Sequence, residues 1–163
     1  MKIVVLSDTH MPKRAKALPE ALIPDLKSAD LILHAGDWQE IEVYTMLAAF
    51  SKVEGVHGNV DSPEVKKLFP EKKIIQAGKF RIGLVHGHGS GKTTEKRAVE
   101  AFKGENVDCI IFGHSHIPVH IIRDGIVLFN PGSATDKRRQ QQFSYGILEA
   151  GDELTAKHVY FGR

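Results

Sequence analysis

The chain has 163 residues, of which 42% are hydrophobic and 26% are charged, and its formal net charge is +2. This length predicts a single domain over residues 1–163 that buries a core without cross-links. The composition excludes disordered and collagen-like proteins, and the small net charge gives no argument for binding nucleic acid or a membrane. The one cysteine, Cys109, excludes an internal disulfide, and its apolar context CIIF predicts a buried thiol.

The first predicted element lies at the N-terminus, where KIVVLS (2–7) reads as a strand. This apolar run is too short for the core of a signal peptide or for a transmembrane helix, so we expect a cytoplasmic protein. Further short runs rich in valine and isoleucine predict strands at 30–35, 53–58, 80–86 and 108–113. Amphipathic patterns between them predict helices at 19–29, 40–51 and 93–104.

Strands that alternate with helices predict βαβ units and a largely parallel sheet that is buried on both faces. The C-terminal third has a different pattern. Residues 118–130 predict two strands around an Asp124-Gly125 turn, and residues 144–161 repeat this pattern around Gly151-Asp152. These hairpins indicate a second sheet, antiparallel or mixed, that packs against the first.

Each of the five predicted α/β strands is followed by a polar cluster: SDTH, GDW, GNVD, HGH and GHSH, in chain order. Ligands of open α/β sheets bind beyond the carboxyl ends of the strands, so we expect these clusters to converge on one rim. Glycines within them fit tight turns at the strand exits. The clusters supply the candidate site residues Asp8, His10, Asp37, Asn59, His86, His114 and His116.

This set combines imidazole, carboxylate and amide groups and contains no thiolate. Such ligands suit Mn²⁺, Fe²⁺, Zn²⁺, Co²⁺ or Ni²⁺, and they match neither Ca²⁺ nor a structural zinc site. Seven ligands exceed the coordination of one transition metal. If one carboxylate bridges, they serve two ions about 3.5–4 Å apart, as in two-metal hydrolytic sites.

The five clusters, in this order, resemble those of the calcineurin-like metallophosphoesterases, and the short chain resembles their small archaeal and bacterial phosphodiesterase branch. The resemblance covers residues 8 to 133. It implies an α/β fold: a four-layer sandwich of two mixed sheets flanked by helices. It further implies that Asp37 bridges two metals, of which one is held by Asp8, His10 and His116 and the other by Asn59, His86 and His114. The segment NPGS (130–133) also resembles one that this branch places beside the metals.

The stretch HGHGSGKTT (86–94) has a second interpretation, because its end resembles a phosphate-binding P-loop. The P-loop pattern requires a glycine where this chain has His86, and a loop shortened by one residue cannot present the same backbone amides. We therefore interpret His86 as a metal ligand and place Lys92 and Thr93 in the first turn of the next helix.

One position departs from the resemblance. Larger members of the family carry a histidine directly after the metal-binding asparagine, where it assists phosphate binding or protonates the leaving group. Here that residue is Val60, which can do neither. His88, two residues beyond His86, is the remaining candidate for a substrate-side catalytic role, with loop polarity as the alternative interpretation.

Other polar and aromatic residues have structural interpretations. His34 and His57 lie inside predicted strands and are expected to be core histidines, whereas His120 and His158 are expected to face solvent. Trp38 is interpreted as a packing residue or a wall of the pocket. The basic run Lys137, Arg138 and Arg139 is expected to be a solvated loop, with contact to an anionic substrate as the alternative.

The predicted function is a metal-dependent phosphodiesterase that acts on a small phosphate ester. Two divalent ions, Mn²⁺ before the alternatives named above, would provide a bridging hydroxide as nucleophile. Two alternatives stay open. A eukaryotic retromer subunit that resembles this branch is an assembly component, so a non-catalytic scaffold is one; a nuclease is the other. A homodimer, the physiological substrate and the native metals are not determined by the sequence.

Overall fold

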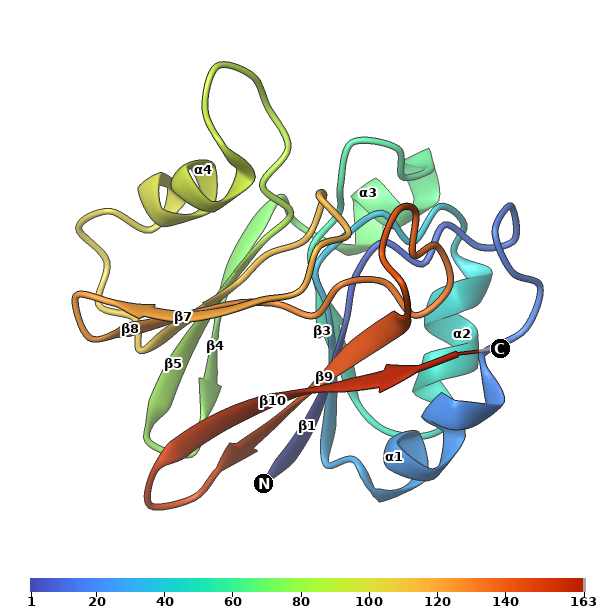
Figure 1. Cartoon of the computed structure of the whole chain (residues 1–163), viewed down its shortest axis with the longest axis horizontal. Coiled ribbons are helices and arrows are strands. Elements are labelled where there is room, and N and C mark those ends of the chain that lie inside the picture. Colours follow the sequence, from blue (N-terminus) through green and yellow to red (C-terminus); the bar gives the residue numbers. More distant parts are fainter. Residues whose placement is uncertain (163) are drawn as a thin grey trace.

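The computed structural model describes residues 1–162. Two five-stranded sheets face each other, and helices cover their outer faces (Figure 1). The strands are β1 (Lys2–Leu6), β2 (Leu31–His34), β3 (Val53–Gly55), β4 (Lys72–Ala77), β5 (Phe80–Val85), β6 (Cys109–Ile111), β7 (Val119–Arg123), β8 (Ile126–Asn130), β9 (Phe143–Ala150) and β10 (Leu154–Phe161). The helices are a 3-10 turn (Glu20–Leu22), α1 (Ile23–Ser28), α2 (Glu42–Ala48), α3 (Pro63–Leu68) and α4 (Thr94–Ala101).

Both sheets are mixed. The first has the order β10-β9-β1-β2-β3, in which β1, β2 and β3 are parallel, β9 is antiparallel to β1, and β10 is antiparallel to β9. The second has the order β4-β5-β6-β8-β7, in which β5, β6 and β8 are parallel and the two edge strands are antiparallel. The predicted α/β sandwich of two mixed sheets with flanking helices is confirmed.

The assignment of strands to sheets differs from the sequence prediction. The five predicted α/β strands do not share one sheet: β1, β2 and β3 belong to the first, whereas β5 and β6 belong to the second. The second C-terminal hairpin, β9–β10, extends the first sheet, where Lys2 of β1 lies opposite Glu149 of β9. Alternation along a strand determines which side chains share a face, and it does not determine which strand is the neighbour.

Two elements were not predicted. Strand β4 (KKIIQA) carries lysines at its start and lies at a sheet edge, paired only with β5. Helix α3 is short, but its start has a clear signal: the Ser62 hydroxyl accepts a hydrogen bond from the Val65 N–H at 3.4 Å, and proline occupies the first turn. This capping pattern was available in the sequence.

Three apolar clusters hold the layers together. The largest fills the space between the sheets and includes Ile3, Ile82 and Phe129. A second packs α1, α2 and α3 onto the first sheet, and a third packs α4 onto the second sheet. Cys109 lies in the core between the sheets, where burial raises the pKa of its thiol to about 12, so it carries no reactive thiolate. Among residues 1–162, no helix is long and apolar enough to cross a membrane.

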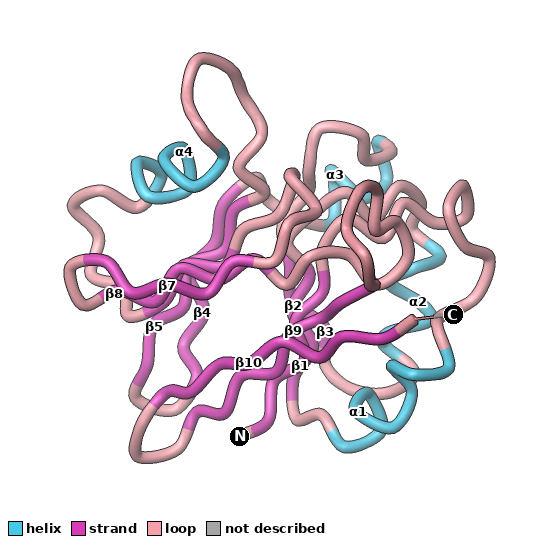
Figure 2. Tube along the Cα trace, in the orientation of Figure 1, coloured by secondary structure: helices cyan, strands magenta, loops and turns pink. Residues whose placement is uncertain are grey.

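The carboxyl ends of β1, β2, β3, β5 and β6 point to the same end of the sandwich, which we call the rim; the opposite end, with the β4–β5, β7–β8 and β9–β10 turns, is the turn end. Loops gather at the rim (Figure 2). Two glycines allow them to approach each other closely. A Cβ at Gly58 would collide with the Asp37 carboxylate, and one at Gly113 would collide with the Ser7 hydroxyl.

Candidate metal centre

Four loops from the two sheets bring six of the predicted ligands together at the rim. The ligand atoms of Asp8, His10 and His116 all lie within 4.8 Å of one another, and those of Asp37, His86 and His114 form a second group of the same kind. The first sheet supplies the loops after β1 and β2, and the second sheet supplies the loops after β5 and β6. The predicted convergence on one rim therefore holds, although two sheets produce it.

The two groups adjoin each other, because each carboxylate reaches a histidine of the other group. Asp37 Oδ2 lies 3.1 Å from His86 Nε2 and 3.6 Å from His10 Nε2. Asp8 Oδ1 lies 3.6 Å from His86 Nε2, and 3.8 and 3.5 Å from the Nε2 atoms of His10 and His116. Nitrogen and oxygen atoms at these separations surround the space between the two groups.

The atoms that face this space have no hydrogen-bond partner. Among residues 1–162, the buried side-chain atoms without a partner are Asp8 Oδ1, His10 Nε2, His86 Nε2, His88 Nδ1 and His116 Nε2. A buried polar atom without a partner costs about 1–3 kcal/mol, and most native proteins contain few of them. Their concentration at one point indicates a bound group that supplies the missing partners.

Hydrogen bonds fix the orientation of two of these rings. His86 Nδ1 lies 2.8 Å from the carbonyl oxygen of Ala35, and His116 Nδ1 lies 2.6 Å from that of Asp136. A carbonyl accepts only, so Nδ1 carries the proton in each ring, and the Nε2 lone pair of the neutral form is directed at the centre. Metal-ligating histidines typically make this hydrogen bond to a backbone carbonyl or carboxylate.

The Asp8 carboxylate is held from one side only. Its Oδ2 accepts hydrogen bonds from the Ser7 hydroxyl at 2.8 Å and from the His114 N–H at 2.9 Å. Its Oδ1 is left facing the histidines. The Ser133 hydroxyl donates to the Asp8 carbonyl at 2.8 Å, which places the NPGS segment beside the centre.

Backbone conformation at the centre is unusual. Asp8, His10, Asp37, His114 and His116 all have positive φ, between 46° and 70°. Non-glycine residues seldom adopt this left-handed region, and such strain concentrates at functional sites.

Asp61 connects two loops of the rim, and no motif in the sequence indicated this role. Its carboxylate accepts hydrogen bonds from the N–H groups of Asp37 at 2.9 Å, Gln39 at 2.8 Å and Gly58 at 2.7 Å. It therefore joins the loop after β2 to the loop after β3. An aspartate two residues after the candidate ligand Asn59 was visible in the sequence, but nothing in its spacing indicated which backbone groups it would bind.

Asn59 is exposed, and its two neighbours in the chain are hydrogen-bonded to Asp61 and Asp37. The Gly58 N–H donates to Asp61, and the Val60 N–H donates to Asp37 Oδ1 at 3.1 Å. These bonds bring the backbone around Asn59 next to Asp37. The Val60 side chain is 46% exposed.

His88 lies beside the centre on the loop that leads to α4. Its ring centroid is 5.6 Å from that of His86. Arg97 of α4 holds this loop: its Nε donates to the Gly87 carbonyl at 2.7 Å, and its other nitrogens contact the Lys92 carbonyl and the Thr94 hydroxyl. Thr93 caps α4 by accepting from the Lys96 N–H at 3.2 Å, so a helix does begin here, but it starts at Thr94, and Lys92 precedes the cap instead of lying in the first turn as predicted.

The electrostatics distinguish His86 from its neighbours. Burial alone would lower its pKa, but the carboxylates of Asp8 and Asp37 raise it to about 9. The pKa of Asp8 falls well below its usual range, because the charge of His86 and the hydrogen bonds to Asp8 outweigh its burial. Burial is the main cause that lowers the pKa values of His88, His114 and His116. Without metal, His86 thus carries the proton that balances the two carboxylates.

The remaining candidates have the following positions. His34 is a buried core histidine, as predicted: Nδ1 accepts from the Gly36 N–H and Nε2 lies 3.0 Å from the Thr9 hydroxyl. Trp38 is fully buried, stacks between His34 and Phe69, and donates to the Val56 carbonyl, so it is a packing residue.

Two histidine predictions were wrong. His57 lies just beyond β3 and is half-buried, because the strand ends earlier than its apolar pattern suggests. His158 does not face solvent: it stacks on Phe129 at 4.4 Å and its Nε2 lies 2.7 Å from the Asn130 carbonyl, between the sheets. His120 is exposed, as predicted.

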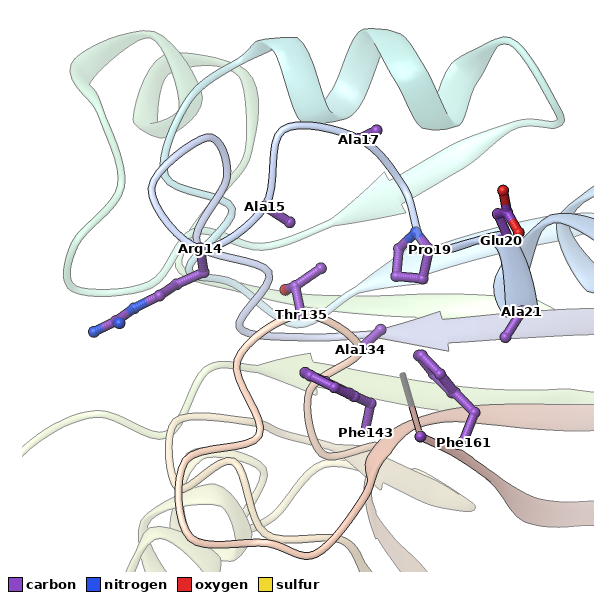
Figure 3. A pocket seen from close by; sticks show the side chains of 11 residues that line it. Arg14, Ala15, Ala17, Pro19, Glu20, Ala21, Ala134, Thr135, Phe143 and Phe161 are labelled. Atoms are coloured by element: carbon purple, nitrogen blue, oxygen red, sulfur yellow. The ribbon is translucent and has the colours of Figure 1, made fainter.

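A mostly apolar cavity near the C-terminal end of β10 contains none of the predicted ligands. Its volume is about 450 Å³, and its walls include Pro19, Ala134, Phe143 and Phe161 (Figure 3). Arg14 stands at its edge and points away from it (Figure 3). A smaller cavity of about 240 Å³ adjoins the centre itself and is lined by His10 and Val60 among others.

Comparison with known proteins places this arrangement in context. Residues 1–153 match the model of the calcineurin-like phosphoesterase superfamily domain. A probable metallophosphoesterase of Methanothermobacter thermautotrophicus is 35% identical over 99% of this chain and 94% of its own length. A zinc complex of Vps29 from Entamoeba histolytica has a TM-score of 0.78 and 26% identity, covering 98% of this chain and 99% of that one. A structure described as a novel archaeal phosphodiesterase has a TM-score of 0.77 and 21% identity, covering 99% and 100%.

Proposed function

Because the chain belongs to the calcineurin-like phosphoesterase superfamily, we propose that it is a phosphodiesterase that works with two divalent metal ions. Asp8, His10 and His116 would hold one ion, and Asn59, His86 and His114 the other. Asp37 would contact both. An archaeal phosphodiesterase shares the fold, and a Vps29 of the same fold holds zinc.

One observation carries this proposal: the buried, unpartnered atoms of Asp8, His10, His86 and His116 face a common space. Hydrogen bonds to Ala35 and Asp136 hold two of these rings with Nε2 toward that space. The donor set of nitrogen and carboxylate oxygen fits a divalent transition metal, with Mn²⁺, Zn²⁺, Fe²⁺, Co²⁺ and Ni²⁺ as candidates. The residues therefore fit the metals that the family implies.

When bound, the two ions supply an activated water as nucleophile and offset the negative charge of the phosphate oxygens. The protein contributes position. The Ser7 hydroxyl and the Val60 N–H donate to the carboxylates of Asp8 and Asp37, and Asp61 holds the Asp37 backbone, so that the ligands are oriented before substrate arrives. Asn59, at the exposed side of Asp37, would orient the phosphate.

His88 is the candidate for protonating the leaving group. Its Nδ1 is buried without a partner, and its ring lies next to that of His86. Burial lowers the pKa of the imidazole in the free protein, and an anionic substrate beside it would favour its protonation. Val60, where larger family members have histidine, supplies no acid. We therefore expect faster turnover of substrates with good leaving groups.

The test follows hydrolysis of bis(p-nitrophenyl) phosphate after removal of metals with a chelator and dialysis. We expect no turnover by the metal-free protein and restored turnover when Mn²⁺ is added. Circular dichroism of both forms serves as the folding control. A folded protein that binds the ions but hydrolyses neither aryl diesters nor aryl monoesters would contradict the proposal, and would favour a metal-binding scaffold on the same fold.

A further inference from the structure

A pocket with an excess of positive charge adjoins the metal centre on the side of His10. The cavity of about 240 Å³ is lined by His10, Gln39, Val60 and Asp136, and by three cationic side chains. These are Lys13, Arg14 and Arg138, and we call this cavity the cationic pocket. Since His10 belongs to the first ligand group, the pocket directly adjoins the place that a phosphate group at the metal centre would occupy.

The positive charge of the cationic pocket is not balanced by its own residues. Asp136 is the only carboxylate in its lining, and Asp136 Oδ2 lies 3.3 Å from Arg14 Nε. Within residues 1–162, no carboxylate lies within 4 Å of the side-chain nitrogens of Lys13 or Arg138. Two positive charges thus remain for a ligand, in a chain whose net charge is only +2.

Lys13 and Arg14 lie on the loop after β1, which carries Asp8 and His10, whereas Arg138 lies between β8 and β9, in a segment that is hydrogen-bonded to the ligands. Arg138 follows Asp136, whose carbonyl accepts from His116 Nδ1, and Ser133 of the same segment donates to the Asp8 carbonyl. On the other loop, the Arg14 N–H donates to the His10 carbonyl at 2.8 Å. The Lys13 N–H donates to Gln39 Oε1 at 3.2 Å. The backbone at Lys13, Arg14 and Arg138 is therefore placed relative to the metal ligands.

On the opposite side of the centre, the Arg97 guanidinium holds the loop that carries His88. Its nitrogens donate to the Gly87 carbonyl, the Lys92 carbonyl and the Thr94 hydroxyl, so they are not free to bind a phosphate group. The large apolar cavity is no alternative site for an anion, because Arg14 is its only cationic side chain among the described residues and points away from it (Figure 3). The two sides therefore differ: three cationic side chains line a cavity beside His10, whereas the Arg97 donors on the His88 side are engaged within the protein.

Resting on the function proposed above, we infer that the cationic pocket binds a second phosphate group of the substrate. The leaving group departs on the side of His88, the candidate acid, so the second phosphate belongs to the part that stays attached to the phosphorus atom. A phosphate monoester carries nearly two negative charges at pH 7, which matches the two unbalanced cations. The Arg138 guanidinium binds such a group through two parallel N–H bonds.

The test compares two probes that differ by one phosphate: the p-nitrophenyl ester of thymidine 5′-phosphate, and the same ester with an additional 3′-phosphate. Both release nitrophenolate, so the leaving group is matched. We expect the Mn²⁺-loaded enzyme to have a kcat/KM at least tenfold higher for the 3′-phosphorylated probe, with a preference that declines as ionic strength rises.

Arg138→Gln should reduce that preference about tenfold, a factor that corresponds to 1.4 kcal/mol and is modest for a charge-assisted hydrogen bond. Lys13→Gln, on the other loop, should also reduce it, and Arg138→Lys should retain part of it. The matched control is Arg139→Gln, which removes the same charge from the neighbouring, exposed residue outside the pocket lining and should keep the full preference.

The two possible failures are distinguishable. Absence of metal-dependent turnover of either probe by the folded protein would overturn the phosphoesterase function itself. Turnover of both probes without preference, or a preference that Arg138→Gln and Lys13→Gln leave unchanged, would overturn the cationic pocket alone. Thermal unfolding of each variant confirms that the comparison is made between folded proteins.

Discussion

The chain reverses direction at both ends of the sandwich, and both ends use glycines with positive φ, but the rim adds a series of non-glycine residues in the same conformation. At the turn end, glycines such as Gly78 and Gly125 adopt the positive φ values that tight turns require. At the rim, Gly36 and Gly87 do the same, but positive φ also falls on a series of non-glycine residues: Asp8, His10, Asp37, Gln39, His114 and His116. Each left-handed non-glycine residue costs on the order of 1 kcal/mol, which glycine would avoid. The rim thus retains side chains where a sequence selected only for stability would use glycine.

Asp124 makes the comparison sharper, because it is an aspartate with positive φ at the turn end. Its φ is 53°, close to the 60° of Asp37, and its side chain is exposed in the β7–β8 turn. The two residues share chemistry and backbone conformation and differ in surroundings. The same substitution at each position therefore separates the effect of the backbone from that of the metal centre.

Asp37→Asn should have the largest effect, with Asp124→Asn as its control. Asparagine tolerates positive φ, so both variants should fold. Loss of the carboxylate that touches both ligand groups should lower kcat/KM for an aryl diester about 10³-fold or more, since metal-assisted charge stabilisation contributes several kcal/mol. Asp124→Asn should retain near-normal turnover. Two bound metals and near-normal turnover in Asp37→Asn would rule out the bridging role.

The pH dependence of the unfolding free energy should distinguish a histidine of the rim from one of the interior. The pKa values of these two buried histidines are shifted in opposite directions. In the metal-free protein, the pKa of His86 is raised from 6.5 to about 9. Its contribution to stability is complete below pH 6.5 and is lost as pH rises through about 9. The pKa of His34 is lowered by burial to about 3, so its contribution is complete above pH 6.5 and is lost as pH falls toward 3.

Urea unfolding of the metal-free protein between pH 4 and 9 should therefore show a maximum near pH 6.5. The alkaline decline should amount to at most about 3 kcal/mol, and His86→Asn should flatten it. Stability that rises between pH 6.5 and 9 would mean that the metal-free rim does not hold this proton.

Asp61→Ala should cost about 2–3 kcal/mol of unfolding free energy, because it leaves the N–H groups of Asp37, Gln39 and Gly58 without their acceptor. Its control at the turn end is Asp30→Ala. Asp30 accepts a single, exposed N–H bond, from Lys2 at 2.7 Å, and its removal should cost under about 1 kcal/mol. Urea unfolding with a chelator present measures both. Equal costs would mean that Asp61 does not brace the rim.

The smallest effect concerns leaving groups. If His88 is the acid, His88→Ala should reduce hydrolysis of alkyl phosphate esters about tenfold more than hydrolysis of nitrophenyl esters, because protonation matters most for basic leaving groups. Val60→His should change the ratio in the opposite direction. Rates for both ester classes, at equal metal content, provide the measurement. Equal losses for both classes in His88→Ala would exclude His88 as the acid.

The difference between the rim and the rest of the fold also explains which features could be predicted from the sequence. Strand exits marked by polar clusters predicted which residues meet at the rim, because parallel strands end at one edge. They could not predict the partition of strands between two sheets, since the β9–β10 hairpin could pair with either. The role of Asp61 could not be predicted, because its hydrogen-bond partners are backbone N–H groups, which every residue except proline carries. The role of Arg138 depends on the turn that follows NPGS, which composition does not determine.

The central claim is that the rim holds two metal ions, and anomalous scattering tests it most directly. Crystals grown with Mn²⁺ and measured above and below the manganese absorption edge should show two anomalous peaks per chain. We expect one among Asp8, His10 and His116 and the other among Asp37, His86 and His114, with Asp37 in contact with both. A fully active protein with one peak, or with no peak between these residues, would contradict the account.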